Sequence, residues 1–168
     1  MGKFMNICGP VIGVTVYSDN KLVARDATIT LPEIVPLTAD LKAMGNYTLP
    51  IWQLLENMET AITKIGADMG LRDIIKPDMK PLEFRWAQTV TDANGVTKNV
   101  GCKAFIKGIP NKIPSIGVTV GEASEHECTI ATTRYNLFVD GQEMFLIDRL
   151  AGIVNIAGKD YANIDSLL

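Results

Sequence analysis

The sequence predicts a mainly β fold, an antiparallel barrel or sandwich with one short helix, in a single domain covering residues 1–168. Three observations support this. Apolar and polar residues alternate repeatedly, as in strands with one buried face. Gly, Pro, Asn and Asp separate these stretches. The length of 168 residues suits one domain with a substantial core.

The first elements form an N-terminal hairpin. Residues 11–17 are rich in β-branched side chains and end at the turn cluster Ser18-Asp19-Asn20. A second strand follows at 22–24, and residues 26–31 continue into a third.

The next part of the chain is less regular. Prolines and Gly45 interrupt residues 32–50, which we expect to be an extended loop and not a second domain. Residues 52–65 permit either a helix beginning near Pro50 or a strand over 58–65, and the β-branched residues favour the strand. Residues 71–75 precede Lys76-Pro77 and are the one helix we expect.

The strongest local pattern is a hairpin of residues 82–91 and 96–107. A two-residue Asn94-Gly95 turn would place apolar residues opposite polar ones, because a slip of one residue inverts every side chain. A three-residue loop, with Gly95 left-handed, aligns the apolar faces. It pairs Trp86 with Cys102, Phe84 with Ala104 and Leu82 with Ile106.

The last third predicts strands at 117–120 and 125–139. Asp140-Gly141 then forms a two-residue turn into 142–148. This turn aligns Leu137 with Met144 and Tyr135 with Leu146. A final strand is expected at about 152–157.

Composition excludes several classes of function. The net charge is -3, with 16 basic and 19 acidic residues and no basic block, so a nucleic-acid binder is not indicated. Apolar stretches are too short to span a membrane, and the first residues lack a signal sequence, so we expect cytoplasmic synthesis without membrane anchoring. The 3 cysteines, Cys8, Cys102 and Cys128, are far apart and predict reduced thiols packed as small hydrophobes.

No catalytic, cofactor-binding or metal-binding residues are predicted. His126 is the only histidine and is interpreted as a half-buried structural residue, and neither Ser124 nor Cys128 lies in a nucleophile motif. Cys128 and His126 could supply two metal ligands, whereas a structural zinc takes four.

Three other groups have structural interpretations. Residues 117–121 lack the glycine spacing of a dinucleotide loop. The acidic cluster of Glu122, Glu125 and Glu127 lacks the pattern of a calcium loop and predicts a solvated edge. The aromatic residues Trp52, Trp86 and Phe84 have no basic groove beside them, which favours core packing over base stacking.

Characteristic strand and hairpin patterns occur at residues 29–33, 80–86 and 104–110, and most clearly at 132–148 and 153–160. In their order, these elements resemble the major tail tube protein family of contractile-tailed phages and phage-tail-like bacteriocin particles. The resemblance covers most of the chain and is diffuse between residues 34 and 79.

The resemblance implies a non-enzymatic subunit of a hexameric ring, in which inner strands of neighbouring subunits join into one barrel. Rings would stack into a hollow tube that delivers DNA or effectors. The implied partners are further copies of the chain, the tail sheath, tape-measure, baseplate and tail terminator proteins, and DNA that passes without specific binding. The protein would belong to a virion or a released tail-like particle.

Two expectations about assembly follow. We expect residues 32–50 to contact a neighbouring subunit or ring, because long excursions are usually functional. We also expect a polar lumen wall, neutral or acidic, because inward-pointing lysines would hold DNA by counterion release. The alternatives are the tube of a bacterial contractile secretion system and a monomeric β-barrel that binds a small ligand.

Overall fold

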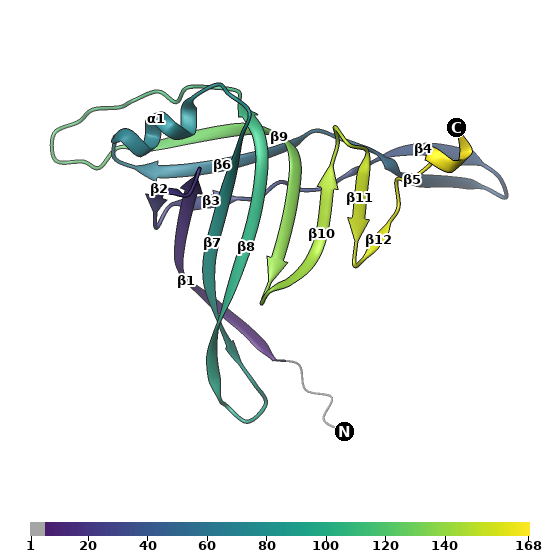
Figure 1. Cartoon of the computed structure of the whole chain (residues 1–168), viewed down its shortest axis with the longest axis horizontal. Coiled ribbons are helices and arrows are strands. Elements are labelled where there is room, and N and C mark those ends of the chain that lie inside the picture. Colours follow the sequence, from purple (N-terminus) through teal and green to yellow (C-terminus); the bar gives the residue numbers. More distant parts are fainter. Residues whose placement is uncertain (1–5) are drawn as a thin grey trace.

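The computed structural model describes residues 6–168 and shows a 10-stranded antiparallel sheet with a separate two-stranded ribbon (Figure 1). Over these residues the sheet is not a closed barrel. The strands of the sheet are β1 (Ile7–Ser18), β2 (Lys21–Arg25), β3 (Thr28–Thr30), β6 (Met58–Ile65), β7 (Lys80–Thr91), β8 (Thr97–Pro110), β9 (Glu125–Val139), β10 (Gln142–Asp148), β11 (Ile153–Ile156) and β12 (Lys159–Asp160). The ribbon consists of β4 (Pro36–Lys42) and β5 (Asn46–Leu55), and the helices are α1 (Met69–Ile75) and the short 3-10 helix η1 (Asp165–Leu167).

Strand β9 is the point at which the sheet divides. One of its edges pairs with β8, and its other edge pairs first with β6 and then with β10. The branch of β6 and β3 packs over β7 and β8, while β10, β11 and β12 continue the sheet in the other direction. The main core therefore lies between β7 and β8 on one side and β6 with α1 on the other.

The core follows from period-two patterning. Along β8, buried and exposed residues alternate from Val100 to Pro110. Fully buried side chains come from both layers, Phe84 and Ile106 from one and Ile62 and Ile74 from the other. Burial of large apolar side chains, each contributing about 1.5–3 kcal/mol, holds the layers together.

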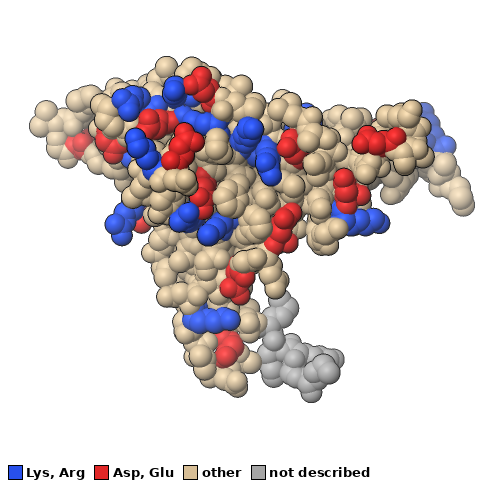
Figure 2. Space-filling view, in the orientation of Figure 1, with Lys and Arg blue, Asp and Glu red and all other residues tan. Residues whose placement is uncertain are grey.

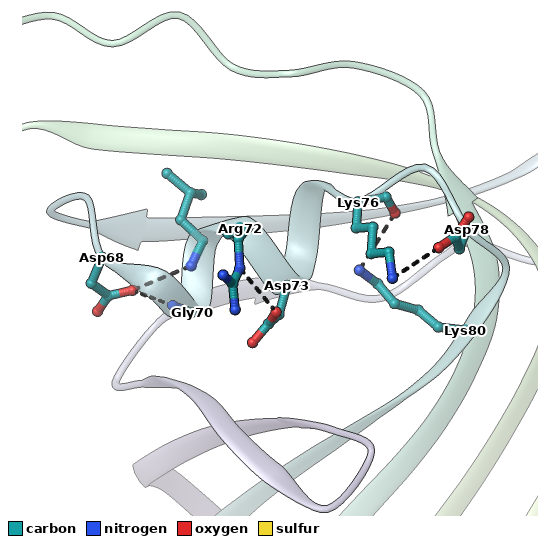
Figure 3. A network of polar contacts seen from close by, with 8 residues as sticks. Asp68, Gly70, Arg72, Asp73, Lys76, Asp78 and Lys80 are labelled. Carbon is teal, nitrogen blue, oxygen red and sulfur yellow. Dashed lines mark hydrogen bonds and ion pairs between the residues drawn. The ribbon is translucent and has the colours of Figure 1, made fainter.

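Helix α1 is attached to the sheet by a polar contact and a close backbone approach, and Figure 3 shows how Asp68 caps its first turn. The carboxylate of Asp68 caps the helix by accepting hydrogen bonds from the backbone of Gly70 at 2.8 Å and Leu71 at 3.2 Å. The nearly buried Lys64 ammonium lies 3.0 Å from Asp68 and donates to the Val23 carbonyl at 2.9 Å. This pairing lowers the pKa of Asp68, chiefly through the Lys64 hydrogen bond. A Cβ at position 70 would collide with the Val23 carbonyl oxygen, so the position requires glycine.

Several sequence predictions are confirmed. The strands over 58–65 and 125–139 have the predicted bounds, and the helix ends at Ile75 before Lys76-Pro77. Strands β7 and β8 pair Trp86 with Cys102, as the three-residue loop requires. Gly95 has φ 77°, the left-handed conformation that this loop needs.

Three strand predictions need correction. The third strand, predicted within 26–31, is β3 and pairs with β6 instead of extending the N-terminal hairpin. Residues 117–120 do not form a strand, because no other described segment pairs with them. A short strand, β12, occupies Lys159–Asp160, beyond the final strand that was expected at about 152–157.

The register of the last long hairpin also differs from the prediction. The turn at Asp140-Gly141 is as predicted, with φ values of 52° and 77°. A bulge between Glu143 and Phe145 then moves Met144 out of the ladder, so Phe145 faces Leu137 and Ile147 faces Tyr135. The reason is packing: the shift brings the Phe145 ring within 4.8 Å of the Tyr135 ring and buries Ile147 completely.

Residues 32–50 were expected to be an extended loop, but they contain the whole of β4 and the first half of β5, which pair to form the ribbon. Leu37 pairs with Ile51 and Lys42 with Asn46 across a tight turn at Met44-Gly45. Strand β5 runs on to Leu55, so the alternative of a helix beginning near Pro50 is wrong. The prolines are compatible with this pairing. Pro36 is the first residue of β4, and each strand of a two-stranded ribbon has one unpaired edge, where a residue without an N–H loses no hydrogen bond.

Candidate assembly surfaces

The residues that were considered for catalysis, His126, Ser124 and Cys128, are buried or partly buried. His126 is fully buried, more than the half-buried position expected, and its Nε2 lies 3.2 Å from the Ser124 hydroxyl. It is enclosed because β6 pairs along this edge of β9 and places Lys64 opposite it. Cys128, two residues further along β9, is also fully buried, and burial raises the pKa of its thiol. The Lys64 ammonium is already bonded to Val23 and Asp68.

The cysteine prediction holds for two of the three residues. Cys102 and Cys128 are buried and unbridged, whereas Cys8 is exposed and corrects the expectation that all three are packed. Cys8 lies opposite Val90 in the part of β1 beyond its pairing with β2.

The remaining sequence candidates lie where the structural interpretations place them. Phe84 is fully buried, and Trp86 and Trp52 pack partly buried against two different core clusters. Glu122, Glu125 and Glu127 are exposed. Within residues 6–168 there is no group of three side chains able to hold a metal ion, and no helix in this range is long and apolar enough to cross a membrane.

The ribbon of β4 and β5 has one apolar and one polar face. In the pairing of the two strands, Leu37 lies opposite Ile51, Ala39 opposite Leu49 and Leu41 opposite Tyr47. Side chains paired in this way share a face. Leu37, Leu41, Leu49 and Tyr47 are 40–56% exposed although they form a continuous apolar surface. An isolated two-stranded ribbon is marginally stable in water, so this face is suited to contact another surface.

The loop between β8 and β9, residues 111–124, is a second exposed apolar segment. Ile116, Val118 and Val120 alternate with small or polar residues and are 55%, 87% and 101% exposed. The ribbon and this loop project from opposite ends of the long axis of the molecule (Figure 1). The ribbon was not predicted from the sequence, although the alternation of Leu37, Ala39 and Leu41 with polar residues is a signal from which this hairpin could have been predicted.

A third surface is the side of β7, β8 and β9 opposite the core, which we call the open face. Phe105 and Phe138 stack edge to face on it, with ring centroids 5.7 Å apart. Two pairs of like charges lie directly opposite across strands, Arg85 with Lys103 and Lys107 with Arg134.

Acidic groups offset part of this positive charge. Glu83 accepts a 2.6 Å hydrogen bond from Arg85, which raises the pKa of the guanidinium. Asp148 lies opposite Arg134, and Glu143 lies opposite Phe138. On the side of the molecule shown in Figure 2, acidic and basic residues are interspersed, without a continuous basic surface. The open face is therefore of mixed charge.

Comparison with known proteins gives one family. The sequence model described as phage tail tube protein FII matches residues 10–164, which is most of the chain. None of the curated proteins compared with the chain matches it. The matched range includes the ribbon, the 111–124 loop and the whole open face.

Proposed function

We propose that this chain, which belongs to the phage tail tube protein FII family, builds the inner tube of a contractile tail from stacked hexameric rings. Family membership makes it a structural tube subunit of a phage tail and a virion component. The contractile tail, the hexamer and the role of the lumen as a conduit for DNA or effectors are our proposal. So are the single-domain organisation of residues 1–168 and the absence of catalytic, cofactor and metal sites.

The observation that carries the proposal is the apolar face of the ribbon. Leu41 and Tyr47 lie opposite each other on an arm that has no core of its own, and both are about half exposed. In a monomer such a surface is an aggregation hazard, whereas in a ring it is buried by the next subunit. We propose that the ribbon contacts the neighbouring subunit, as expected for residues 32–50.

The open face is the surface that we propose for the lumen. The second layer, formed by β6, β3 and α1, thickens the subunit only on the core side. When such wedge-shaped subunits close edge to edge, the thicker layer fits on the wider outer circumference and the single-layered face turns inward. Joined sheets would thereby form a ring-wide barrel.

This assignment contradicts the sequence expectation of a neutral or acidic lumen wall without inward-pointing lysines. The open face carries four basic residues, Arg85, Lys103, Lys107 and Arg134, together with the acidic residues Glu83, Glu143 and Asp148. The proposed wall has mixed charge, which limits the number of phosphates that it can neutralise at once. Replacing both lysines with glutamine should leave tubes intact and reduce the salt dependence of DNA retention in them. Unchanged DNA retention would argue that another surface lines the lumen.

The other proposed partners are those that the resemblance to tail tube proteins implies. Stacking of identical rings joins two different surfaces and gives open filaments unless something stops them. Length would be set by a tape-measure protein and a tail terminator, growth would begin on a baseplate, and sheath subunits would surround the tube. The family match favours a phage tail over the tube of a secretion system.

A deletion tests the role of the ribbon. Removing residues 37–45 should give a soluble, folded monomer that forms no tubes, because these residues contribute little to either core cluster. Negative-stain electron microscopy and circular dichroism measure the two parts of this result. Undiminished tubes from the shortened chain would refute the assigned role.

A further inference from the structure

Residues 116–120 have the sequence of a strand but no strand partner in the subunit. Ile116, Val118 and Val120 alternate with Gly117 and Thr119, the pattern of a strand with one apolar face. Val118 and Val120 are nevertheless 87% and 101% exposed, so the subunit gives this face nothing to pack on. Exposed valines at alternate positions are costly in water and are typical of a segment that pairs with another chain.

We propose that residues 116–120 of one copy add as a strand to the free edge of β4 in the ribbon of a neighbouring copy. This inference rests on the proposed tube function and identifies the contact that the ribbon makes. The result would be a three-stranded sheet shared by two subunits. Each backbone group of the added segment that faces β4 would then gain a hydrogen-bond partner.

The edge of β4 fits this role. Among the described strands, β4 pairs only with β5, and after its first residue, Pro36, it contains no proline. Its apolar positions Leu37, Ala39 and Leu41 repeat with the same period of two as Ile116, Val118 and Val120. Addition in register would widen the apolar face of the ribbon, because all six residues would then lie on one side.

The placement of the two segments fits neighbours related by a rotation. The ribbon and the 111–124 loop project from opposite ends of the subunit (Figure 1), so one copy cannot pair them with each other. A head-to-tail arrangement brings the loop of each subunit to the ribbon of the next, and such contacts generate closed rings when the rotation closes.

The decisive experiment combines one substitution with hydrogen exchange. Val118→Pro removes a backbone donor and restricts the backbone at the centre of the segment, whereas Val118→Thr keeps a β-branched side chain of similar size. Both variants should fold as wild type does, with an unchanged thermal midpoint, because residue 118 is exposed and outside every strand. We expect Val118→Pro to lower the yield of tubes at least tenfold and Val118→Thr to assemble normally.

Hydrogen exchange locates the effect. In wild-type tubes the amides of residues 116–120 that face β4 should exchange at least tenfold more slowly than in dilute, unassembled subunits. Tubes in which these amides exchange equally fast, or a full yield of tubes from Val118→Pro, would overturn the strand addition and leave the tube function standing. A wild-type chain that forms neither rings nor tubes would instead refute the proposed function, and this inference with it.

Discussion

The two-layered core and the ribbon are built from the same kind of residue but have opposite relations to solvent. In the core, Phe84 and Ile62 are fully buried between layers of one subunit. In the ribbon, Leu41 and Tyr47 pair just as regularly and remain 44% and 56% exposed. In the proposed tube, the core specifies the fold of the subunit and the ribbon specifies contacts beyond it. Substitutions in the two regions should therefore separate stability from assembly.

The largest effect on subunit stability is expected at the core. Phe84→Ala should lower the free energy of unfolding by about 3–5 kcal/mol, because it removes a fully buried ring and leaves a cavity between the layers. Urea denaturation followed by circular dichroism measures this loss. A cost below about 1 kcal/mol would show that the layers do not depend on this contact.

An intermediate effect is expected where α1 is attached. Asp68→Ala should cost about 1 kcal/mol, because the helix loses its cap and the nearly buried Lys64 loses its carboxylate. Asp68→Asn is the matched control, since the amide oxygen can still cap the helix but carries no charge. Equal stability of the alanine and wild-type chains would contradict this account of the attachment.

The pH dependence of the same site has a defined sign. Because the folded-state pKa of Asp68 is below its ordinary value of 3.8, its charge stabilises the fold above that value. This stabilisation is lost as the pH falls through the lowered pKa. The difference in unfolding free energy between wild type and Asp68→Asn should accordingly shrink below about pH 3.8. A difference that grows on acidification would contradict the assignment.

The smallest effect on stability is expected in the ribbon, together with the clearest effect on assembly. Leu41→Ser should change the unfolding free energy of the monomer by less than about 0.5 kcal/mol, since the side chain is already 44% exposed. It should abolish or severely reduce tube formation. Thr38→Ser, on the polar face of the same strand, is the control and should assemble normally; similar assembly of both variants would show that the apolar face is not an interface.

Local patterning predicted the strands whose partners are close in the chain. The pairing of Trp86 with Cys102 followed from matching apolar faces across a short loop, and both strands supply those faces themselves. The helix before Lys76-Pro77 followed from the restriction that proline places on the preceding residue.

Features that depend on side-chain packing or on distant partners were not predictable from the sequence. The bulge beside Met144 exists because Phe145 packs on Tyr135, and alternation alone gives no sign of it. The burial of His126 depends on β6, which is far away in sequence. Residues 117–120 are the reverse case, since their pattern is that of a strand and the subunit provides no partner. The open face also depends on how β8 and β9 align, so its pair of Lys107 and Arg134 could not be predicted from local patterns.

The most direct test of the tube assignment is negative-stain electron microscopy of the purified wild-type chain over a range of concentrations. The account predicts rings or hollow tubes of uniform diameter that become more abundant as concentration rises. A field containing only particles the size of an 18.3 kDa monomer at every concentration would contradict it.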